Sequence, residues 1–342
     1  MTPVDLRSDT FTRPTAAMRA VMAAADVGDD CWGEDPTARR LEERSAEMLG
    51  KPAALFVPSG TMANQIALLL HCRPGDEVIV GRGAHTRLYE SGAGAAWAGV
   101  QFAEIGAPDG TFDPDELEAA RLPVDRNLPR SRLVAIENTH NRGGGRIWPR
   151  PLVESVAARA RMLGLALHLD GARIWNASVA SGVSEREIAA PFDTVAACFS
   201  KGLGAPVGSV IAGTGEAIVQ ARRFRKMLGG GMRQVGVLCA AALFALEHHR
   251  TRLADDHGNA RRLAAGLAET PGVRVEPARV ETNIVIFDVA PLAGEELSRR
   301  LAASGVLIGV IGPSRLRAVT HLDVDAPGID RALVAIRTAL SA

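Results

Sequence analysis

Cysteine is scarce in this sequence, and the cysteines that occur are scattered. There are four among 342 residues, with no C-x-x-C pair. Structural zinc sites and disulfide frameworks both need several cysteines at short, regular spacings. The sequence therefore predicts neither kind of site. The cysteines are Cys31, Cys72, Cys198 and Cys239.

An excess of charge of one sign and a long apolar run are also missing. Lysine and arginine together number 39, and so do aspartate and glutamate. Such a balance makes nucleic acid or an anionic membrane surface a poor candidate for the main partner. No apolar run reaches the length of a membrane span, and the first residues, MTPVDLRSDT, lack the apolar core of a signal peptide. We therefore expect a cytoplasmic protein with neither a nucleic-acid nor a membrane partner.

What the sequence does contain is an alternation of short apolar runs and longer helical patterns. Nearly continuous apolar strands separated by helices are typical of a mostly parallel sheet covered on both faces, so the expected fold class is α/β. The expected strands cover residues 54–58, 77–81, 100–105, 132–138, 165–171, 194–201 and 208–213, and the expected helices include 60–72, 149–164 and 215–228.

The pattern changes near residue 250. A long polar helix followed by shorter strands and helices is typical of a smaller α+β domain. We therefore predict a large domain over residues 1–250, with an N-terminal arm, and a small C-terminal domain over residues 251–342. Two segments, 121–131 and 142–147, have the composition of loops.

Two charged residues follow one of the expected strands in the stretch HLDGAR. Asp170 ends the apolar strand 165–171, and Arg173 comes shortly after it. Ligands of open α/β sheets bind at the carboxyl ends of the strands. One interpretation is a structural Asp–Arg pair, because burial of an unpaired carboxylate is costly. The other is a carboxylate that holds a protonated ring nitrogen, with the arginine beside an anionic oxygen.

Lys201 stands among glycines in the stretch CFSKGLGAPVGS, directly after the next apolar run. If the two strands are neighbours, Lys201 and Asp170 point into the same crevice. A lysine that forms a Schiff base and an aspartate that keeps a pyridine nitrogen protonated are what pyridoxal 5′-phosphate requires. The sequence therefore indicates this cofactor.

Two further stretches fit such a cofactor. In PSGTMANQ, a strand leads through Gly60 and Thr61 into a helix, whose N-terminal N–H groups bind anions such as phosphate; the alternative is an ordinary helix cap. His85, in GRGAHTRLYESG, follows the strand 77–81 and would stack on the cofactor ring, with Tyr89 and Glu90 close behind. A single histidine is otherwise more often structural.

Basic residues in the last third or so of the chain are candidates for holding a carboxylate. RKMLGGGMRQ contains Lys226 and Arg233, and RLRAVTHLDV contains Arg317. A guanidinium binds a carboxylate with two parallel hydrogen bonds. The alternative for each is a solvated surface charge.

Together these stretches resemble the low-specificity L-threonine aldolases, pyridoxal-phosphate enzymes with the aspartate aminotransferase fold, known as fold type I. The matching stretches follow the family's order between residues 5 and 324, so the resemblance covers nearly the whole chain. They are DLRSDTFTRP, GDDCWGEDPT, PSGTMANQ, ENTHN, HLDGAR, FSKGLGAPVGS, RKMLGGGMRQ and RAVTHLDV.

The resemblance implies a role in cofactor binding for several matching residues. Lys201 would bind the cofactor covalently, Asp170 would contact its pyridine nitrogen, and His85 would cover its ring. Gly60 and Thr61 would hold its phosphate.

The resemblance also implies which residues bind the substrate, and it implies an active site shared between subunits. Ser8, Arg173 and Arg317 would bind the amino-acid carboxylate, with Arg173 also near the phenolic oxygen of the cofactor. Arg233 would reach the phosphate from a neighbouring subunit. The protein would thus be a homo-oligomer, a dimer or a tetramer, and it would need no metal.

The sequence departs from the family pattern at the site of a second histidine. Family members often carry this histidine before ENTHN, where this chain has Asn127. Asparagine is not a base at neutral pH, so the threo/erythro preference is open. Trp32 stands where tyrosine is frequent, and the glycines of RGGGRI lengthen the loop after ENTHN, so we expect a differently shaped pocket for the β-substituent.

The implied reaction is retro-aldol cleavage of L-threonine, L-allo-threonine or related L-3-hydroxy-α-amino acids to glycine and an aldehyde. The base for the β-hydroxyl is open between His85, a water placed by Glu90, and His140. The alternative is another reaction of the same cofactor, namely β-elimination, transaldolase-type transfer or racemisation, because the pocket selects the bond that breaks. A non-catalytic protein on this fold is disfavoured by the presence of the whole residue set.

Overall fold

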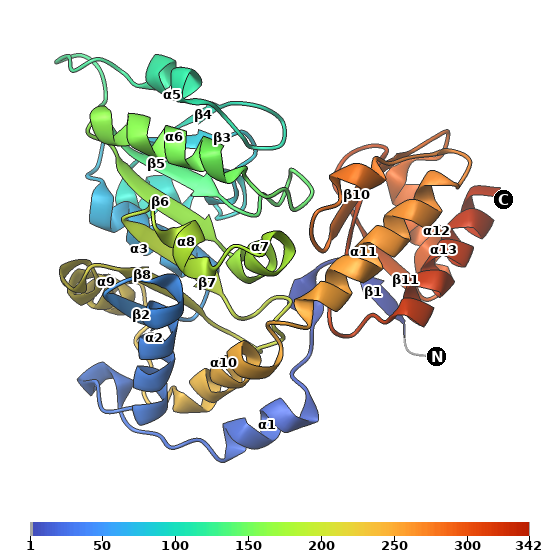
Figure 1. Cartoon of the computed structure of the whole chain (residues 1–342), viewed down its shortest axis with the longest axis horizontal. Helices are drawn as coiled ribbons and strands as arrows, with labels where there is room; N and C mark the ends of the chain where they lie inside the picture. Colours follow the sequence, from blue (N-terminus) through green and yellow to red (C-terminus); the bar gives the residue numbers. More distant parts are fainter. Residues whose placement is uncertain (1–2, 342) are drawn as a thin grey trace.

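The larger of two β-sheets has seven strands in the order β2-β8-β7-β6-β5-β3-β4 in the computed structural model, which describes residues 3–341 (Figure 1). β8 is antiparallel to both of its neighbours, and all other pairs are parallel. The predicted α/β class with a mostly parallel sheet is therefore confirmed. The strands are β2 (Ala53–Val57), β3 (Glu77–Gly81), β4 (Gln101–Ile105), β5 (Ser131–Glu137), β6 (Ala166–Gly171), β7 (Thr194–Cys198) and β8 (Ser209–Gly213).

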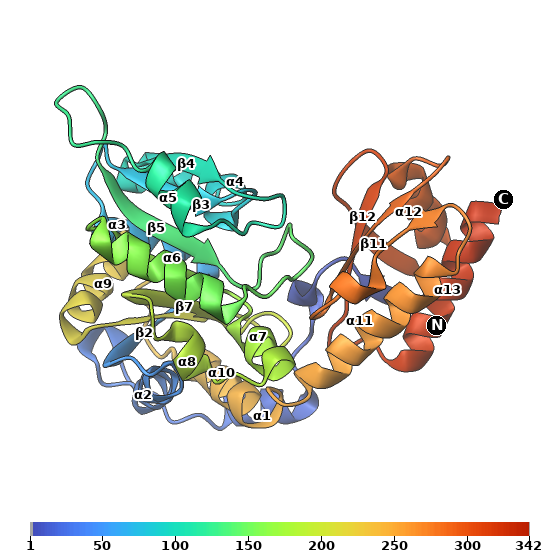
Figure 2. The ribbon, with the colours of Figure 1, turned by 45° about the horizontal axis from the view of Figure 1, so that its top comes forward.

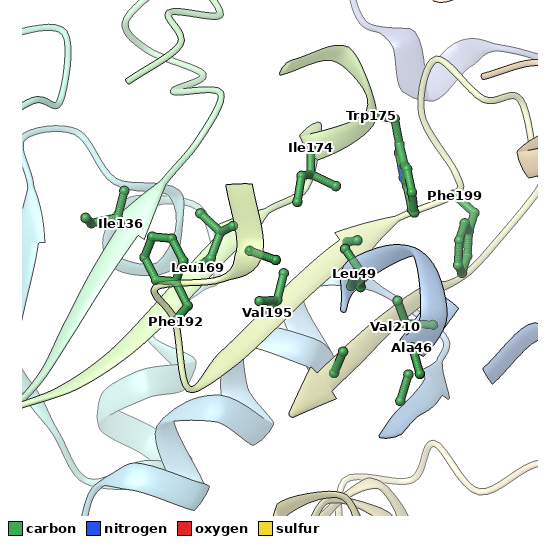
Figure 3. Close-up of a cluster of buried hydrophobic side chains, with 14 of the residues drawn as sticks. Ala46, Leu49, Ile136, Leu169, Ile174, Trp175, Phe192, Val195, Phe199 and Val210 are labelled. Carbon is green, nitrogen blue, oxygen red and sulfur yellow. The ribbon is translucent and has the colours of Figure 1, made fainter. Parts of the chain in front are cut away.

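Both faces of this sheet are covered, as its apolar strands require. Val195 of β7 and Val210 of β8 pack in a cluster with Leu169 on one face (Figure 3). The residues that follow them, Ala196 and Ile211, belong to a second cluster under α3 and α9. This alternation is the period of two that a pleated strand imposes. The helices before residue 250 are α1 (Ala16–Ala23), α2 (Pro36–Leu49), α3 (Gly60–His71), α4 (His85–Leu88), α5 (Pro114–Ala120), α6 (Arg150–Met162), α7 (Ile174–Ser181), α8 (Glu185–Ala189), α9 (Gly215–Met227) and α10 (Gly236–His248), with short helical turns η1 (Asp9–Phe11), η2 (Asp30–Trp32) and η3 (Gly94–Ala98).

Strand β7 ends earlier than the apolar run predicts. The run reaches Lys201, but the strand stops at Cys198. Beyond it the chain closes a loop on itself, because the N–H of Gly204 donates to the carbonyl of Lys201 at 2.8 Å and that of Ala205 to the carbonyl of Phe199 at 3.2 Å. Lys201 therefore lies on a turn just outside the sheet.

The smaller sheet has five strands in the order β1-β11-β12-β10-β9. β1 comes from the beginning of the chain and runs parallel to β11, with Leu6 opposite Ile308. Figure 2 shows α11 leading from the larger sheet to the smaller one. The elements are β1 (Val4–Leu6), α11 (Leu253–Ala268), β9 (Val273–Arg274), η4 (Pro277–Arg279), β10 (Ile284–Val289), α12 (Gly294–Ala303), β11 (Val306–Val310), β12 (Arg315–Val319) and α13 (Ala326–Ser341). The division into residues 1–250 and 251–342 stays a prediction, and residues 4–6 pair with the smaller sheet.

The topology brings several loops to one edge of the larger sheet. β2, β3, β5, β6 and β7 all run in the same direction, so their carboxyl ends meet at this edge. Ligands bind at such an edge in open α/β sheets. Across residues 3–341, no helix combines the length and the apolar character that crossing a membrane would need.

Candidate active site

Asp170 is buried at the carboxyl end of β6, with 3% of its surface exposed. Its Oδ2 accepts a hydrogen bond from the amide of Asn64 at 2.8 Å, and its Oδ1 accepts one from the N–H of Ala172 at 3.2 Å. Arg173 does not contact it in the hydrogen-bond network. The structural Asp–Arg pair considered from the sequence is therefore not what holds this carboxylate.

His85 lies at the carboxyl end of β3, with its ring against Glu90. Its Nδ1 is 2.9 Å from Oε1 of Glu90, and its backbone N–H donates to Oε2 of Glu137 at 2.7 Å. Burial alone would lower the pKa of His85, but the hydrogen bond to Glu90 and the charges of Asp170 and Glu137 outweigh it and raise that pKa. Because Nδ1 is engaged by Glu90, the ring nitrogen left for a ligand is Nε2.

His85, Glu90 and Asp170 form one cluster, in which a ligand atom from each lies within 4.8 Å of the others. Both oxygens of Glu90 accept amide N–H groups, from Asn64 at 2.8 Å and Gln65 at 2.6 Å. The carboxylates of the cluster are thus tied to α3 and to His85 by hydrogen bonds.

Lys201 presents a half-buried amine that has no acidic partner among residues 3–341. The only hydrogen bond of this amine there is to Sγ of Cys198, at 3.1 Å. The surrounding glycines permit its turn: Gly204 has φ +80°, and at Gly208, with φ +110°, a Cβ would lie 2.4 Å from the ring of Phe56. The glycines therefore serve the sharp turn that places the amine beyond the strand.

The N-terminus of α3 lies between the ends of β2 and β7. Ser59 caps it, with its hydroxyl accepting the N–H of Met62 at 3.2 Å. A Cβ at Gly60 would lie 2.8 Å from Sγ of Cys198, so a larger residue would push the helix away from β7. Gly60 and Thr61 are both partly exposed. The capping interpretation is thus correct for Ser59, and the N–H groups of Gly60 and Thr61 lie at an accessible helix N-terminus.

Arg173 is buried against the N-terminal segment. It forms a two-point ion pair with Asp9, through Nε at 2.8 Å and Nη2 at 2.7 Å. Burial alone would raise the pKa of Asp9, but Arg173 and the charge of Lys201 outweigh it and hold that pKa far below its usual range. Arg173 and Lys201 therefore lie close to the same carboxylate.

Arg317 of β12 faces the same segment without an acidic partner among residues 3–341. Nη1 donates to Oδ1 of Asn141 at 2.7 Å, Nη2 donates to the carbonyl of Arg7 at 3.2 Å, and the buried Nε has no partner. Burial and the charge of Arg173 lower the pKa of Arg317. Ser8 follows Arg7 directly and caps η1. An anion at this place would give Arg317 the partner that it lacks.

Other predicted residues lie apart from this cluster within the chain. Arg233 is exposed and pairs with Asp29 at 3.2 Å, and Lys226 is exposed as well. Trp32 has 78% of its surface exposed. Asn127 lies on the exposed loop that precedes β5, at the amino end of that strand and hence at the edge of the sheet opposite to Asp170.

His140 has a structural place. It is fully buried, its Nδ1 accepts the N–H of Gly143 at 3.0 Å, and a Cβ at Gly110 would lie 2.2 Å from its ring. This packing favours the structural interpretation of His140 and leaves His85 as the better candidate for the base. The sequence did not distinguish them.

Several residues of the site were missed by sequence reasoning. Asp9, Asn64 and Gln65 lie inside the quoted stretches DLRSDTFTRP and PSGTMANQ, but nothing local marks them as partners of Arg173, Asp170 and Glu90. The only indication in the sequence was that they lie beside motif residues. Other residues in the same stretches lie there too and have no role in the site.

A hollow of about 560 Å³ lies elsewhere, between the loop 146–149, α6, α8 and the segment 280–281. None of the predicted site residues lines it. The predicted site lies instead at the carboxyl-end edge of the larger sheet.

The comparisons with known proteins identify the family of the chain. Residues 5–290 match the family model described as beta-eliminating lyase. The chain belongs to this family. Low-specificity L-threonine aldolase 1 of Arabidopsis thaliana is 46% identical over 99% of this chain and 97% of its own length, and the low specificity L-threonine aldolase of Escherichia coli K12 is 44% identical over 94% of both chains. The Leishmania major threonine aldolase structure superposes with a TM-score of 0.83 at 22% identity, over 98% of this chain and 99% of that one, which confirms the fold.

Beta-eliminating lyases of this kind use pyridoxal 5′-phosphate, and the residues of this chain fit it. A buried carboxylate at Asp170 suits a protonated ring nitrogen, and the unpaired amine of Lys201 suits the aldehyde carbon. The N-terminus of α3 at Gly60 suits the phosphate. This member of the family is therefore a lyase with the cofactor that the sequence indicated.

Proposed function

We propose that this protein cleaves the Cα–Cβ bond of L-threonine, L-allo-threonine or related L-3-hydroxy-α-amino acids to give glycine and an aldehyde. The relatives at 44–46% identity named as L-threonine aldolases support this reaction. So does Arg317, whose guanidinium has no acidic partner among residues 3–341 and lies beside the segment that carries Ser8 and Asp9. The carboxylate of an amino acid supplies the missing anion.

The substrate is held through its carboxylate. Arg317 would bind it, with the hydroxyl of Ser8 next to it, while Arg173 stays paired with Asp9 and adds positive charge from behind. Holding the carboxylate would decide which bond at Cα is perpendicular to the cofactor ring. That orientation would select the bond to be broken.

Pyridoxal 5′-phosphate, when bound, accepts the electron pair of the bond that breaks. Asp170 would hold the proton on the ring nitrogen, which its burial and its hydrogen bond from Asn64 favour. Lys201 would hold the cofactor through its amine. The ring of His85 would cover one face of the cofactor ring, with its Nε2 left free because Nδ1 faces Glu90.

Removal of the proton from the substrate hydroxyl falls to His85 in this proposal. Its Nδ1 faces Glu90, so that Nε2 is the atom that accepts the proton. The pKa of His85 is raised, so the ring loses its proton, and becomes a base, at a higher pH than a free histidine does.

Release of acetaldehyde and glycine from L-threonine and from L-allo-threonine tests the reaction. The chain has three lysines. We expect Lys201→Ala to lose at least ~10³-fold in turnover, because the attachment of the cofactor is lost, whereas Lys51→Ala, which only removes a bond to the carbonyl of Phe192, keeps full activity. Full turnover by Lys201→Ala would refute the assignment, and 2-oxobutanoate with ammonia instead of aldehyde and glycine would establish β-elimination.

Assembly and location belong to the same proposal. Arg233 is exposed, and its one ion pair among residues 3–341 is with Asp29, which suits a residue that reaches the phosphate of a neighbouring subunit. We propose a homo-oligomer, as a dimer or a tetramer, in the cytoplasm. A monomer in sedimentation experiments that is fully active would contradict the shared site.

A further inference from the structure

A chain of buried side chains leads away from Asp170 along the underside of α3. It begins at the amide of Asn64 and continues from Oδ1 of Asn64 to Nε2 of His168 at 3.1 Å. Nδ1 of His168 is 2.9 Å from Oγ1 of Thr194, which is 2.9 Å from Nε2 of His71. Asn64, His168 and Thr194 are at most 2% exposed. The chain thus crosses the sheet from the carboxyl end of β6 to the amino end of β7.

The two carboxylates fix the direction of every bond in this chain. Glu90 and Asp170 accept hydrogen bonds when ionised, so Asn64 must turn its NH₂ toward both of them. Its Oδ1 then requires a donor, which is the Nε2–H of His168. The Nδ1 of a neutral His168 is left as an acceptor for the hydroxyl of Thr194, whose oxygen in turn accepts the Nε2–H of His71.

We propose that Asn64 and His168 are positioning residues of the active site. His168 holds the side chain of Asn64 so that its NH₂ group faces Asp170 and Glu90. Thr194 and His71 complete a hydrogen-bond chain in which every donor points the same way. The inference rests on the proposed function in one respect, namely that Asp170 contacts the ring nitrogen of the cofactor. In such a chain each bond polarises the next one, so the donor that faces the carboxylates is strengthened.

The environment of His168 agrees with this direction. Burial lowers the pKa of His168 to about 4, so the ring is neutral near pH 7 and has one N–H to donate. Burial also lowers the pKa of His71. A doubly protonated His168 would leave the hydroxyl of Thr194 without its acceptor.

Asp170 has several charged neighbours besides this chain. His85 and Glu90 lie in the same cluster, Glu137 lies opposite Asp170 on the adjacent strand β5, and His168 lies two residues earlier on β6 itself. The pH dependence of the site therefore reflects all of these groups together. A comparison between variants isolates the contribution of the hydrogen-bond chain.

The test is the pH dependence of pyridoxal 5′-phosphate affinity in His168→Leu, His168→Gln and Thr194→Val. A carboxylate that has lost part of a hydrogen bond is protonated more readily. Cofactor affinity should fall on the acid side, or acid limb, of its pH profile, and we expect His168→Leu to move this fall to higher pH by about one unit, the shift expected from one weakened hydrogen bond. In His168→Gln, whose amide donates to Oδ1 of Asn64, the fall should return to the wild-type pH. Thr194→Val should shift it less than His168→Leu does.

His257 supplies the matched control. It is also buried, its Nε2 contacts the amide of Asn176 at 3.1 Å, and burial lowers its pKa to about 4 as well. His257→Leu should lower the melting temperature but leave the acid limb in place. The proposal is overturned if His168→Leu keeps the wild-type limb, if His168→Gln shifts it as far as the leucine variant does, or if His257→Leu shifts it equally.

A second measurement needs no variant. Nitrogen NMR of the imidazoles in the wild-type protein near pH 7 should find His168 neutral with its proton on Nε2; a proton on Nδ1, or on both nitrogens, overturns the inferred direction. Neither measurement uses the substrate. A protein that binds the cofactor and passes both tests but releases no aldehyde would therefore sink the proposed reaction and leave this inference intact.

Discussion

The two sheets differ in where along the chain their strands originate. The larger sheet gathers its strands from one continuous stretch, residues 53–213, and carries Asp170, Lys201 and His85 at one edge. The smaller sheet joins the two ends of the chain, because β1 pairs with β11. It contributes Arg317 and, through β1, the segment with Asp9. The three residues proposed to contact the cofactor ring thus lie in one stretch, whereas Ser8 and Arg317, which we propose bind the substrate carboxylate, come from opposite ends of the chain.

The largest effect is expected where the two regions are tied together. Asp9→Ala leaves Arg173 buried without its partner, which costs about 3–5 kcal/mol of the free energy of unfolding. The control is Asp5→Ala, which removes a pair with Arg7 that is partly exposed and worth about 0–1 kcal/mol. Denaturant unfolding measures both, and equal losses would show that the junction does not depend on the buried pair.

The same pair has a pH dependence of known sign. Because the folded protein lowers the pKa of Asp9, its contribution is fully present above the unfolded pKa near 4 and is lost as the pH falls below that value toward the folded pKa. Wild-type stability should therefore fall more steeply below pH 4 than that of Asp9→Ala.

The next effect separates substrate binding from cofactor binding. Arg317→Ala should raise the KM for the amino acid by about 100-fold, since charge-assisted hydrogen bonds are worth about 1.5–3 kcal/mol, with little change in cofactor affinity. Arg315→Ala, two residues earlier on the same strand and exposed, should leave KM alone. A parallel loss of cofactor affinity in Arg317→Ala would mean that the smaller sheet also helps to hold the cofactor.

The smallest effect concerns the larger sheet alone. Glu90→Gln removes the carboxylate that raises the pKa of His85, so the acid limb of kcat should move to lower pH by up to about one unit. Glu247→Gln, beside the exposed His248 at 3.9 Å, serves as the control. An unmoved limb in Glu90→Gln would assign the proton transfer to a group other than His85.

The sequence predicted the larger sheet well for a physical reason. Its strands are buried on both faces and read as apolar runs, and β3 (Glu77–Gly81) has the predicted bounds. β1 has only three residues, and its pairing with a strand three hundred positions away leaves no local pattern. Lys201 was placed correctly at the end of its run, although the strand itself stops at Cys198 because the turn closes there.

The side-chain partners of the site were not predictable in the same way. Arg173 looked equally suited to Asp170 and to a substrate, but it pairs with Asp9, 164 positions away. Asp170 is instead held by Asn64, 106 positions away. Neither choice follows from spacing, because both depend on which helix packs over which strand.

The sequence by itself determined the order of strands and helices, the edge at which Asp170, Lys201 and His85 gather, and the cofactor that such a set serves. Apolar periodicity and the common direction of parallel strands are local rules that a sequence carries openly. Only the tertiary structure decided that Arg173 is already paired and Arg317 is not, and that Asn64 turns its NH₂ toward Asp170. Those outcomes depend on packing between distant segments, which decides which polar groups the fold brings within hydrogen-bond reach of one another.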